Sequence, residues 1–382
     1  MKFTIEKKDL LSISNIAYRA ASTKSTIPLL SGLLLQLDHE TGLTLTSTDM
    51  EIGIKASTRE VEIIEPGTLV VNAHYFNDLI RLLPDKPIKF SFNQETSKLM
   101  LNYGRSTGSI NTYPAEDYPD LPLQKKASSF FLPQDVLKEG LRKTVFAATT
   151  NHFRQVFTGV LFDILETGQV NIVASDTHRL ARYICRLEEE KREPFHFIVP
   201  IRAVNELLRI IGDQEEKIEV SFAENNIIFS KNNIILLSRL IDGQYPNYEQ
   251  VIPHKFVSHI LIKSDVLSRS LERIRVIPGN DKYKIQHVQL SFNEGELWLN
   301  SASENAGEIT EFIEQAEIDG DESVKIAFNT NYFLDVVRIL ESEGEKISID
   351  LSGSLGPAII KNPDDDKYLY VLVPLRTTGQ RE

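Results

Sequence analysis

The 382-residue chain lacks several features that define common protein classes. It has one cysteine, Cys185, which excludes a disulfide framework and any metal or iron–sulfur site built from several thiolates. No stretch approaches the roughly 18 apolar residues that a membrane-spanning helix needs, and the N-terminus reaches charged residues before it builds a signal-peptide core. These absences favour a cytoplasmic protein in a reducing compartment, with no membrane partner.

The sequence also lacks the motifs of common catalytic sites. G-x-S-x-G, the Walker A phosphate loop, G-x-G-x-x-G and H-E-x-x-H are all missing. Ser175, Asp176 and His178 are close in the sequence, but a catalytic triad requires side chains that meet in space. The acidic run 364–366 follows an Asn-Pro pair and is typical of a solvated turn rather than a cation site. We therefore expect no catalytic residue, no metal site and no cofactor.

Basic residues are in deficit, with 42 Lys and Arg against 54 Asp and Glu and a net charge of −12. Because phosphate binding depends on Lys and Arg, this balance alone argues against nucleic acid. The deficit is uneven, since six stretches with helical periodicity contain 16 basic and 8 acidic residues, a net of +8 that leaves −20 elsewhere. An acidic protein with a basic helical face can meet a polyanion on that face, although many helices expose Lys and Arg only to solvent. The six predicted helices are residues 7–24, 72–83, 134–154, 201–211, 263–275 and 331–340.

The chain does contain a threefold repeat. Three similar segments, VVNAHYFNDLIRLL, IVPIRAVNELLRII and AFNTNYFLDVVRIL, align Arg81, Arg209 and Arg338 at spacings of 128 and 129 residues. Their apolar residues recur at i, i+3, i+4 and i+7, which predicts a helix with one buried face. Strand-like runs and Tyr-Pro turns keep the same period. The repeat predicts three domains, at residues 1–127, 128–253 and 254–382.

Each predicted domain divides into two halves. In the first domain the pattern of a strand, a helix and three strands occurs twice. A half with a single helix cannot cover both faces of its sheet, so two halves should pack together. We predict an α+β fold in which antiparallel sheets lie outside and a pair of helices lies on the inner face. A structural duplication without a ligand is the simpler interpretation of such a repeat.

Further motifs extend along the whole chain: IPLLSGLLL from Ile27, TSTDMEI from Thr46, VASDTHRLA from Val173, DGQYPNYEQVIP from Asp242, FNTNYFLDVV from Phe328 and VLVPLR from Val371. Together, and in this order, they resemble the bacterial sliding clamps, the family of the DNA polymerase III beta subunit. The resemblance implies a non-catalytic homodimer that closes head to tail into a six-domain ring, with helices lining the hole and sheets forming the outer wall. Such a ring encircles double-stranded DNA of any sequence and tethers the replicative polymerase, which answers the objection from net charge.

The resemblance also implies three groups of site residues. The dimer interface would include Gly104, Gly108, Val276 and Ile277, and Lys24 and Arg154 would face DNA. We predict Arg202 as a further DNA-facing residue, because it stands at the start of a predicted helix. A peptide-binding pocket between the second and third domains would capture short segments of polymerases, the clamp loader and repair proteins. Its matching positions are Phe157, Ser175, Thr177, His178, Arg179, Leu180, Pro246, Val251, Pro357, Val371, Val373, Pro374, Leu375 and Arg376.

Several positions depart from the family pattern. Thr177 stands where a glycine is common, and Gln250 stands where a basic residue often lies. Val373 and Leu375 replace frequent methionines, and branched side chains adapt less readily than methionine to varied partners. Residues 377–382 extend past the usual end of the family.

Two other functions compete with the clamp. One is a repeat-built scaffold that binds proteins but not DNA, and the other is an enzyme whose active site lies between repeats. The basic helices favour the clamp over the scaffold, and the missing catalytic motifs disfavour the enzyme.

Overall fold

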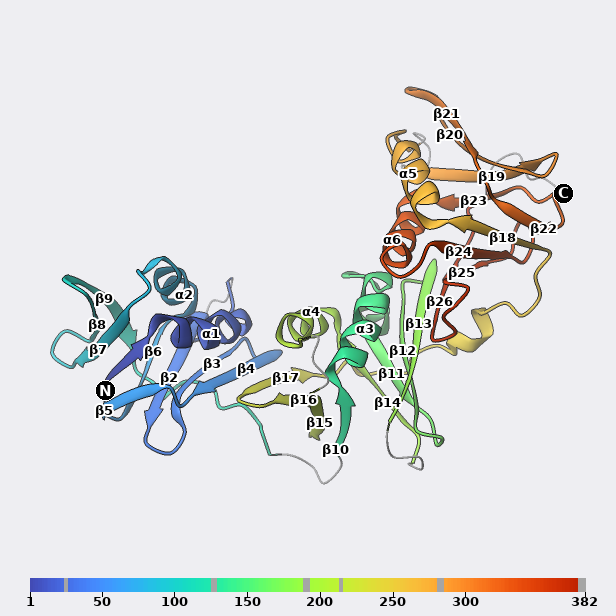
Figure 1. Cartoon of the computed structure of the whole chain (residues 1–382). Helices are drawn as coiled ribbons and strands as arrows, with labels where there is room; N and C mark the ends of the chain where they lie inside the picture. The colour runs from blue at the N-terminus through green and yellow to red at the C-terminus, as the bar shows by residue number, and fades with distance from the viewer. Residues whose placement is uncertain (24–26, 125–128, 188–192, 213–215, 280–284, 377–382) are drawn as a thin grey trace. The chain divides into compact units, whose positions relative to one another are not determined.

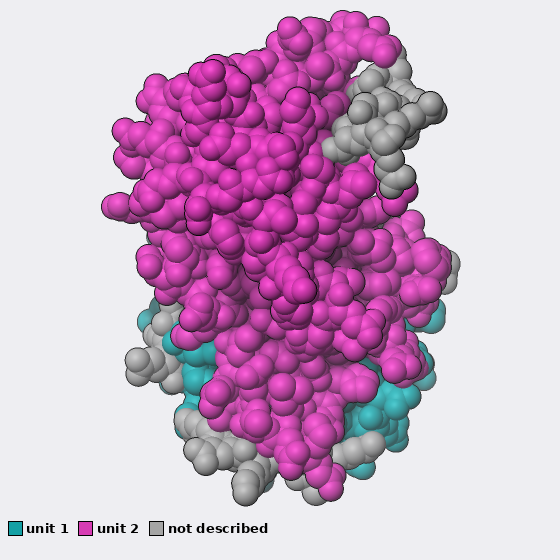
Figure 2. All heavy atoms as spheres, turned by 90° about the vertical axis from the view of Figure 1, so that its right-hand side faces the viewer, with its two compact units in different colours: residues 1–138, 202–240 teal, residues 139–201, 241–382 magenta. Residues whose placement is uncertain are grey.

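The computed structural model describes residues 1–23, 27–124, 129–187, 193–212, 216–279 and 285–376. The chain forms two compact units, which Figure 2 colours separately. Unit 1 comprises residues 1–138 and 202–240, and unit 2 comprises residues 139–201 and 241–382. The division into three domains stays a prediction. No helix in the described part of the chain is long and apolar enough to cross a membrane.

The described residues form six α-helices, and each begins directly after a strand in a region where the sequence predicts a helix (Figure 1). They are α1 (Lys7–Ala17), α2 (Ala73–Leu82), α3 (Gln134–Thr144), α4 (Ile201–Ile210), α5 (Ser264–Ile274) and α6 (Thr330–Glu341). Asparagine side chains cap α2 and α6: Asn72 accepts one hydrogen bond, from the N–H of Tyr75, and Asn329 accepts two, from the N–H groups of Asn331 and Tyr332.

Two of the predicted helices were too long. The helices predicted over 7–24 and 134–154 tighten into single 3₁₀ turns at Tyr18–Ala20 and Val145–Ala147, and then end. This shortening changes the charge argument, because Arg154 and other flanking basic residues lie outside the α-helices. Within their observed bounds the six α-helices contain 11 basic and 9 acidic residues, a net of +2 rather than +8. The basic character of the helical face is therefore much weaker than the sequence pattern indicated.

Unit 1 is built on one continuous sheet of 13 strands, all joined by antiparallel pairing. In spatial order the strands are β10 (Ser129–Pro133), β15 (Lys217–Ala223), β16 (Asn226–Lys231), β17 (Ile234–Arg239), β4 (Ile52–Thr58), β3 (Gly42–Thr48), β2 (Gly32–Asp38), β6 (Gly67–Asn72), β9 (Ser106–Tyr113), β8 (Lys98–Tyr103), β7 (Pro87–Asn93), β1 (Lys2–Glu6) and β5 (Val61–Glu65). The pairing of β17 with β4 joins segments almost 180 residues apart in the sequence.

Unit 2 contains two antiparallel sheets. The larger has nine strands in the order β14 (Phe195–Pro200), β11 (Gly159–Ile164), β12 (Gln169–Ser175), β13 (Arg179–Arg186), β26 (Tyr368–Leu372), β25 (Ala358–Lys361), β24 (Lys346–Leu351), β18 (Ser258–Lys263) and β22 (Glu317–Gly320). The smaller has four strands in the order β21 (Gly307–Ile313), β20 (Glu296–Ser303), β19 (His287–Asn293) and β23 (Ile326–Asn329). Antiparallel sheets combined with packed helices confirm the predicted α+β class.

The predicted half-domain pattern omits two strands. β5 and β22 occupy equivalent places in their repeats, since β5 pairs with β1 and β22 pairs with β18. Their sequences, VEIIE and EIDG, are short and largely exposed, so they lack the alternation that marks a half-buried strand. Each forms only because a preceding strand offers an open edge.

The helices α1 and α2 pack together because they share one apolar core in unit 1. Leu10 of α1 and Phe76 of α2 are fully buried in one apolar cluster with Phe3 and Phe90 of the sheet. The rings of Phe3 and Phe90 stack with centroids 4.7 Å apart. α1 and α2 lie side by side on this sheet, as Figure 1 shows. The predicted helix pair is therefore present on one face of the sheet.

Candidate functional site: an apolar groove in unit 2

A groove with a cavity volume of about 200 Å³ lies within unit 2. Its walls come from the ends of β12 and β26, the start of β13, the 3₁₀ turn Gln155–Thr158 and the segment that leads into the 3₁₀ turn Tyr248–Val251. Most of the lining is apolar, with a few polar groups at the edge. The lining residues are Arg154, Phe157, Ser175, Thr177, Arg179, Leu180, Tyr245, Pro246, Asn247, Tyr248, Val251, Val371 and Val373.

A hydrogen-bonded turn between β12 and β13 shapes one edge of the groove. Oδ1 of Asp176 accepts hydrogen bonds from the backbone N–H groups of His178 and Arg179, both at 3.0 Å. Oγ of Ser175 donates to the carbonyl of Arg179 at 2.7 Å and accepts from the N–H of Thr177. Thr177 itself has φ of +77°, a left-handed conformation that is unfavourable for a β-branched residue. Glycine would adopt this conformation without steric strain.

Strand pairing brings distant residues together along the floor of the groove. β13 and β26 pair antiparallel, so Leu180 lies opposite Val371 although the two are almost 200 residues apart in the sequence. The N–H of Val373 donates to the carbonyl of His178 at 3.0 Å, which extends this contact past the end of β26. The side chains of Leu180 and Val371 are buried, whereas that of Val373 is 39% exposed.

Aromatic side chains form the opposite wall. The hydroxyl of Tyr248 donates to Oδ2 of Asp163 at 2.6 Å and accepts from Nδ2 of Asn171 at 3.0 Å. Burial raises the pKa of Tyr248, so its hydroxyl stays protonated and keeps donating. The rings of Phe157 and Tyr245 meet edge to face with centroids 5.7 Å apart. The wall is therefore held by hydrogen bonds before any ligand binds.

Arg179 is a buried basic residue that lines the groove. Its guanidinium contacts Oδ2 of Asp176 at 3.0 Å and Oδ2 of Asp335 at 2.7 Å, and it lies 4.1 Å from the centroid of the Tyr332 ring. Burial by itself would lower the pKa of Arg179, but Tyr370 and the two carboxylates outweigh burial and raise it. With both carboxylates already paired to it, Arg179 acts mainly as an anchor that holds the turn.

Nine of the fourteen residues predicted for a peptide pocket line this groove. The other five do not: they are His178, Pro357, Pro374, Leu375 and Arg376. Leu375 is held elsewhere, because its N–H donates to the carbonyl of Ala327 at 2.7 Å. His178 contributes its backbone carbonyl to Val373. Whether these residues bind a peptide stays a prediction.

Four lining residues were not predicted for the pocket: Arg154, Tyr245, Asn247 and Tyr248. Tyr245, Asn247 and Tyr248 lie close to Pro246 in the DGQYPNYEQVIP motif. The aromatic residues near this proline were the sequence signal that could have identified them as part of the pocket. Arg154 was predicted to face DNA instead. Its guanidinium lies over the ring of Phe153, 5.6 Å from the centroid, and the Phe153 side chain is 85% exposed.

The remaining predicted site residues are not among those that line the groove. Lys24 lies outside the described residues. Arg202 forms an ion pair with Asp49 inside unit 1, so its charge is already compensated. At the predicted dimer contact, the side chain of Val276 is 76% exposed, whereas that of Ile277 is buried.

The two glycines predicted for the dimer contact are open to their surroundings. Gly104 lies in the turn between β8 and β9, with φ of +67°, and Gly108 lies within β9. A Cβ atom added at either glycine would meet nothing within 4 Å among the described residues.

The polar cluster at the turn is not arranged for catalysis. The Ser175 hydroxyl donates to a backbone carbonyl, and the Asp176 carboxylate is occupied by two amides and Arg179. Across the described residues, no group of three or more His, Cys, Asp or Glu side chains is placed to hold a metal ion. Repeated helix-on-sheet halves therefore carry an apolar groove of a kind that suits a binding protein.

Comparison with known proteins assigns the family. Three family models match in order: the N-terminal domain of the DNA polymerase III beta subunit over residues 1–122, the central domain over 131–247 and the C-terminal domain over 249–376. The chain therefore belongs to the DNA polymerase III beta subunit family. It is a DNA sliding clamp and is non-catalytic, and the scaffold and enzyme alternatives are not favoured.

Relatives cover the whole chain. The beta sliding clamp of Bacillus subtilis is 28% identical over 385 residues, which is 99% of this chain and all of that protein. The beta sliding clamp of Halalkalibacterium halodurans is 29% identical, with the same coverage. The solved Bacillus subtilis clamp superposes with a TM-score of 0.91 over 99% of each chain. A Pseudomonas aeruginosa clamp bound to griselimycin superposes with a TM-score of 0.90 at 27% identity, over 99% of this chain and all of that one.

Proposed function

We propose that two copies of this chain close head to tail into a ring around double-stranded DNA. The ring tethers the replicative polymerase, and the groove in unit 2 captures the partner's peptide. The observation that carries this proposal is the set of three family models, which match the chain in order and almost end to end. Clamp loaders, other polymerases and repair proteins are proposed as further partners, and the cytoplasm as the location.

Open strand edges support the head-to-tail contact. β9 of unit 1 pairs with β8 along its length but with β6 only at Thr112 and Tyr113, so most of its other edge is open within the described chain. β21 of unit 2 is the last strand of its sheet. An open edge presents unpaired N–H and C=O groups that favour pairing with another chain. A contact between different surfaces of two copies closes into a ring where the rotation permits.

The dimer contact can be tested with one exposed residue. Because Val276 is 76% exposed, Val276→Asp should leave the fold intact and place a charge in the interface. We expect light scattering at micromolar concentration to report the dimer for the parent chain and a shift to monomer for the variant. Val257→Asp, at a valine that is 43% exposed, is the control and should remain dimeric. A monomeric parent chain at that concentration would contradict ring closure.

Weak contact with DNA agrees with the charge distribution. The six α-helices carry a net charge of only +2, and Arg202 is paired with Asp49. Retention by encirclement needs no tight phosphate contact, and loose, water-bridged contacts permit sliding. Protein loaded on nicked circular DNA should stay bound, and cutting the circle should release it. Equal retention on circular and linear DNA would overturn the topological proposal.

The groove is proposed to bind an extended peptide with leucine and phenylalanine anchors. Its floor of Leu180 and Val371 and its wall of Phe157 suit apolar side chains, and small apolar pockets with a few polar groups are a common mode of peptide recognition. Val251 is half exposed at the rim, so Val251→Asp should weaken binding of such a peptide by at least tenfold without loss of the dimer. Deletion of residues 373–382 should abolish it. Unchanged peptide affinity in both variants would show that the groove is not the docking site.

A further inference from the structure

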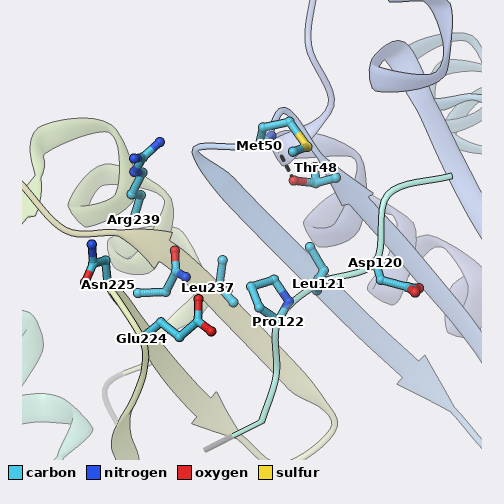
Figure 3. A pocket seen from close by; sticks show the side chains of 10 residues that line it. Thr48, Met50, Asp120, Leu121, Pro122, Glu224, Asn225, Leu237 and Arg239 are labelled. Atoms are coloured by element: carbon cyan, nitrogen blue, oxygen red, sulfur yellow. Dashed lines mark hydrogen bonds between the residues drawn. The ribbon is translucent and has the colours of Figure 1, made fainter.

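A second groove, of about 340 Å³, lies within unit 1 (Figure 3). It forms where β4 pairs with β17 and is crossed by the segment 120–122. The hairpin between β15 and β16 supplies its third side through residues 224–226. Nothing in the family assignment requires a site here.

The internal repeat relates this groove to the groove in unit 2. The turn 48–52 reproduces the turn 175–179: Met50 and Thr177 both have φ of +77°. Oδ1 of Asp49 accepts from the N–H groups two and three residues further on, as Oδ1 of Asp176 does. The hydroxyl that opens each turn accepts from the N–H two residues later. The same local structure therefore forms one edge of both grooves.

The strand pairing is repeated as well. Gly53 lies opposite Leu237 in unit 1, just as Leu180 lies opposite Val371 in unit 2. A Cβ atom added at Gly53 would lie 2.4 Å from Cδ2 of Leu121, so the missing side chain leaves room for Leu121 to pack. Leu121 and Leu237 thus give the second groove an apolar floor.

The rim of the second groove differs in charge. Arg239 stands where unit 2 has Val373, and its guanidinium lies 3.9 Å from the Glu51 carboxylate. Glu224 and Asp120 add two exposed carboxylates, and within the described part of the chain neither has an ion-pair partner. Figure 3 shows the Glu224 side chain turned toward the floor of the groove, and Asp120 at its far end. The result is an apolar floor with an uncompensated acidic rim.

We propose that this groove is a second docking site, which takes an extended peptide carrying a lysine or arginine beside an aliphatic residue. Charge complementarity with Glu224 and Asp120 selects the basic side chain, and Leu121 and Leu237 receive the aliphatic one. The peptide class rests on the function proposed for the groove in unit 2, whereas the charge preference rests on unit 1 alone. One chain would then offer two grooves with different preferences: the groove in unit 2 would bind apolar peptide side chains, and the groove in unit 1 would bind peptides with a basic side chain.

Methionine methyl groups provide a specific readout. The chain has three methionines, Met1, Met50 and Met100, and only Met50, which is 63% exposed, lines the groove. In full-length protein labelled with ¹³C at the methionine methyl groups, titration with acetyl-Leu-Lys-Leu-amide should shift the Met50 signal saturably and leave the other two unchanged. The same peptide with an Nε-acetylated lysine should bind about fivefold to twentyfold more weakly, because it lacks the charge.

Charge-neutral variants test the two carboxylates. Glu224→Gln and Asp120→Asn should each weaken binding about twofold to fivefold, as expected for exposed ion pairs. Glu294→Gln is a matched control, because Glu294 is also an exposed glutamate at a hairpin turn, with φ of +52° against +54° for Glu224. It should bind the peptide like the parent chain.

The outcomes separate this proposal from the one for unit 2. Val251→Asp should weaken binding of a leucine–phenylalanine peptide by at least tenfold, measured by fluorescence anisotropy, and leave the Met50 titration unchanged. A Met50 signal that does not move at millimolar lysine peptide, or that moves equally with the acetylated peptide, overturns the second site. Equal affinity in Glu224→Gln, Asp120→Asn and the parent chain overturns it too. None of these results bears on the unit 2 groove, which the anisotropy assay tests alone.

Discussion

Replacing Lys143 by methionine is expected to destabilise unit 2 strongly. Lys143 lies in α3 with its side chain 2% exposed. Its Nζ atom contacts Oε1 of Glu139 at 2.8 Å, Oε2 of Glu343 at 2.9 Å and Oδ2 of Asp365 at 3.2 Å. These carboxylates come from α3, from just after α6 and from the turn before β26, so one ammonium group ties together three parts of the unit.

The size of this destabilisation depends on how far water can solvate the three carboxylates once the ammonium group is gone. At an effective dielectric constant of about 20, each contact near 3 Å corresponds to about 5 kcal/mol of Coulomb energy before desolvation is subtracted. The three carboxylate side chains are 14–41% exposed, so water can partly replace the lost ammonium group. Breaking a buried pair on one side typically costs about 3–5 kcal/mol, and we expect about 3 kcal/mol here. Methionine keeps the apolar stem, so little of this loss reflects a cavity.

Thermal unfolding provides the assay. For a unit of about 200 residues, 3 kcal/mol corresponds to a fall in Tm of about 6–12 °C. Lys8→Met removes an exposed lysine from α1 and is the control, with an expected change within about 0.5 kcal/mol. Glu139→Gln in the Lys143→Met background removes one of the stranded carboxylates and should restore part of the stability.

The pH dependence tests the electrostatic origin. Burial favours a higher pKa for Glu139, but hydrogen bonds from Lys143 and Tyr183 outweigh it and lower that pKa below its ordinary value of 4.5. The ionised Glu139 therefore contributes stability above that value, and the contribution is lost as the pH falls through the lowered pKa. The loss of unfolding free energy caused by Lys143→Met should be largest near pH 7 and should shrink below about pH 4.5. A deficit that stays constant from pH 7 to pH 4, or a variant as stable as the parent, would refute the reasoning.

Three further predictions follow from single positions in unit 2. Thr177→Gly should stabilise the protein by about 0.5–1 kcal/mol in urea unfolding, because the strain of a β-branched residue at φ of +77° exceeds the extra backbone entropy of glycine; destabilisation would contradict this. Burial raises the pKa of the Cys185 thiol to about 12, so the folded chain should not react with a disulfide reagent at pH 8 until urea unfolds it. Immediate labelling of the folded chain would refute the burial of this thiol. Because the thiol ionises more readily in the unfolded chain, the fold should also become less stable as the pH rises above about 9. Gly140→Ala should lower the free energy of unfolding by about 1–3 kcal/mol in the same urea assay, although alanine favours helices. The added Cβ atom would lie 2.7 Å from atoms of both Ile172 and Tyr183. An unchanged free energy of unfolding would show that these two side chains move aside.

Local sequence was enough to place most of the elements. The apolar spacing that predicted one buried helical face is realised in α2, where Phe76 and Ile80 are fully buried and Arg81 is exposed. The predicted order of a strand, a helix and three strands is realised in β1, α1, β2, β3 and β4. These features depend on side-chain period and on neighbours within a few residues, which the sequence contains directly.

Other features arose only from packing. The ends of α1 and α3 are set by 3₁₀ turns, and strands β5 and β22 form only beside β1 and β18. Because several basic residues lie beyond the observed helix ends and α6 extends to Glu341, the basic surplus that favoured DNA binding fell from +8 to +2. Family resemblance, not charge, therefore carries the assignment to a DNA clamp.

Both grooves illustrate the limit of the sequence by itself. The repeat determined that turns 48–52 and 175–179 share one local structure, because each turn closes its hydrogen bonds within five residues. Only the tertiary structure decided that Leu180 lies opposite Val371 and that Glu224 and Leu237 line one groove, since pairing between distant strands brings these residues together. The free energy of such pairings depends on the whole sheet, and no local pattern in the sequence encodes it.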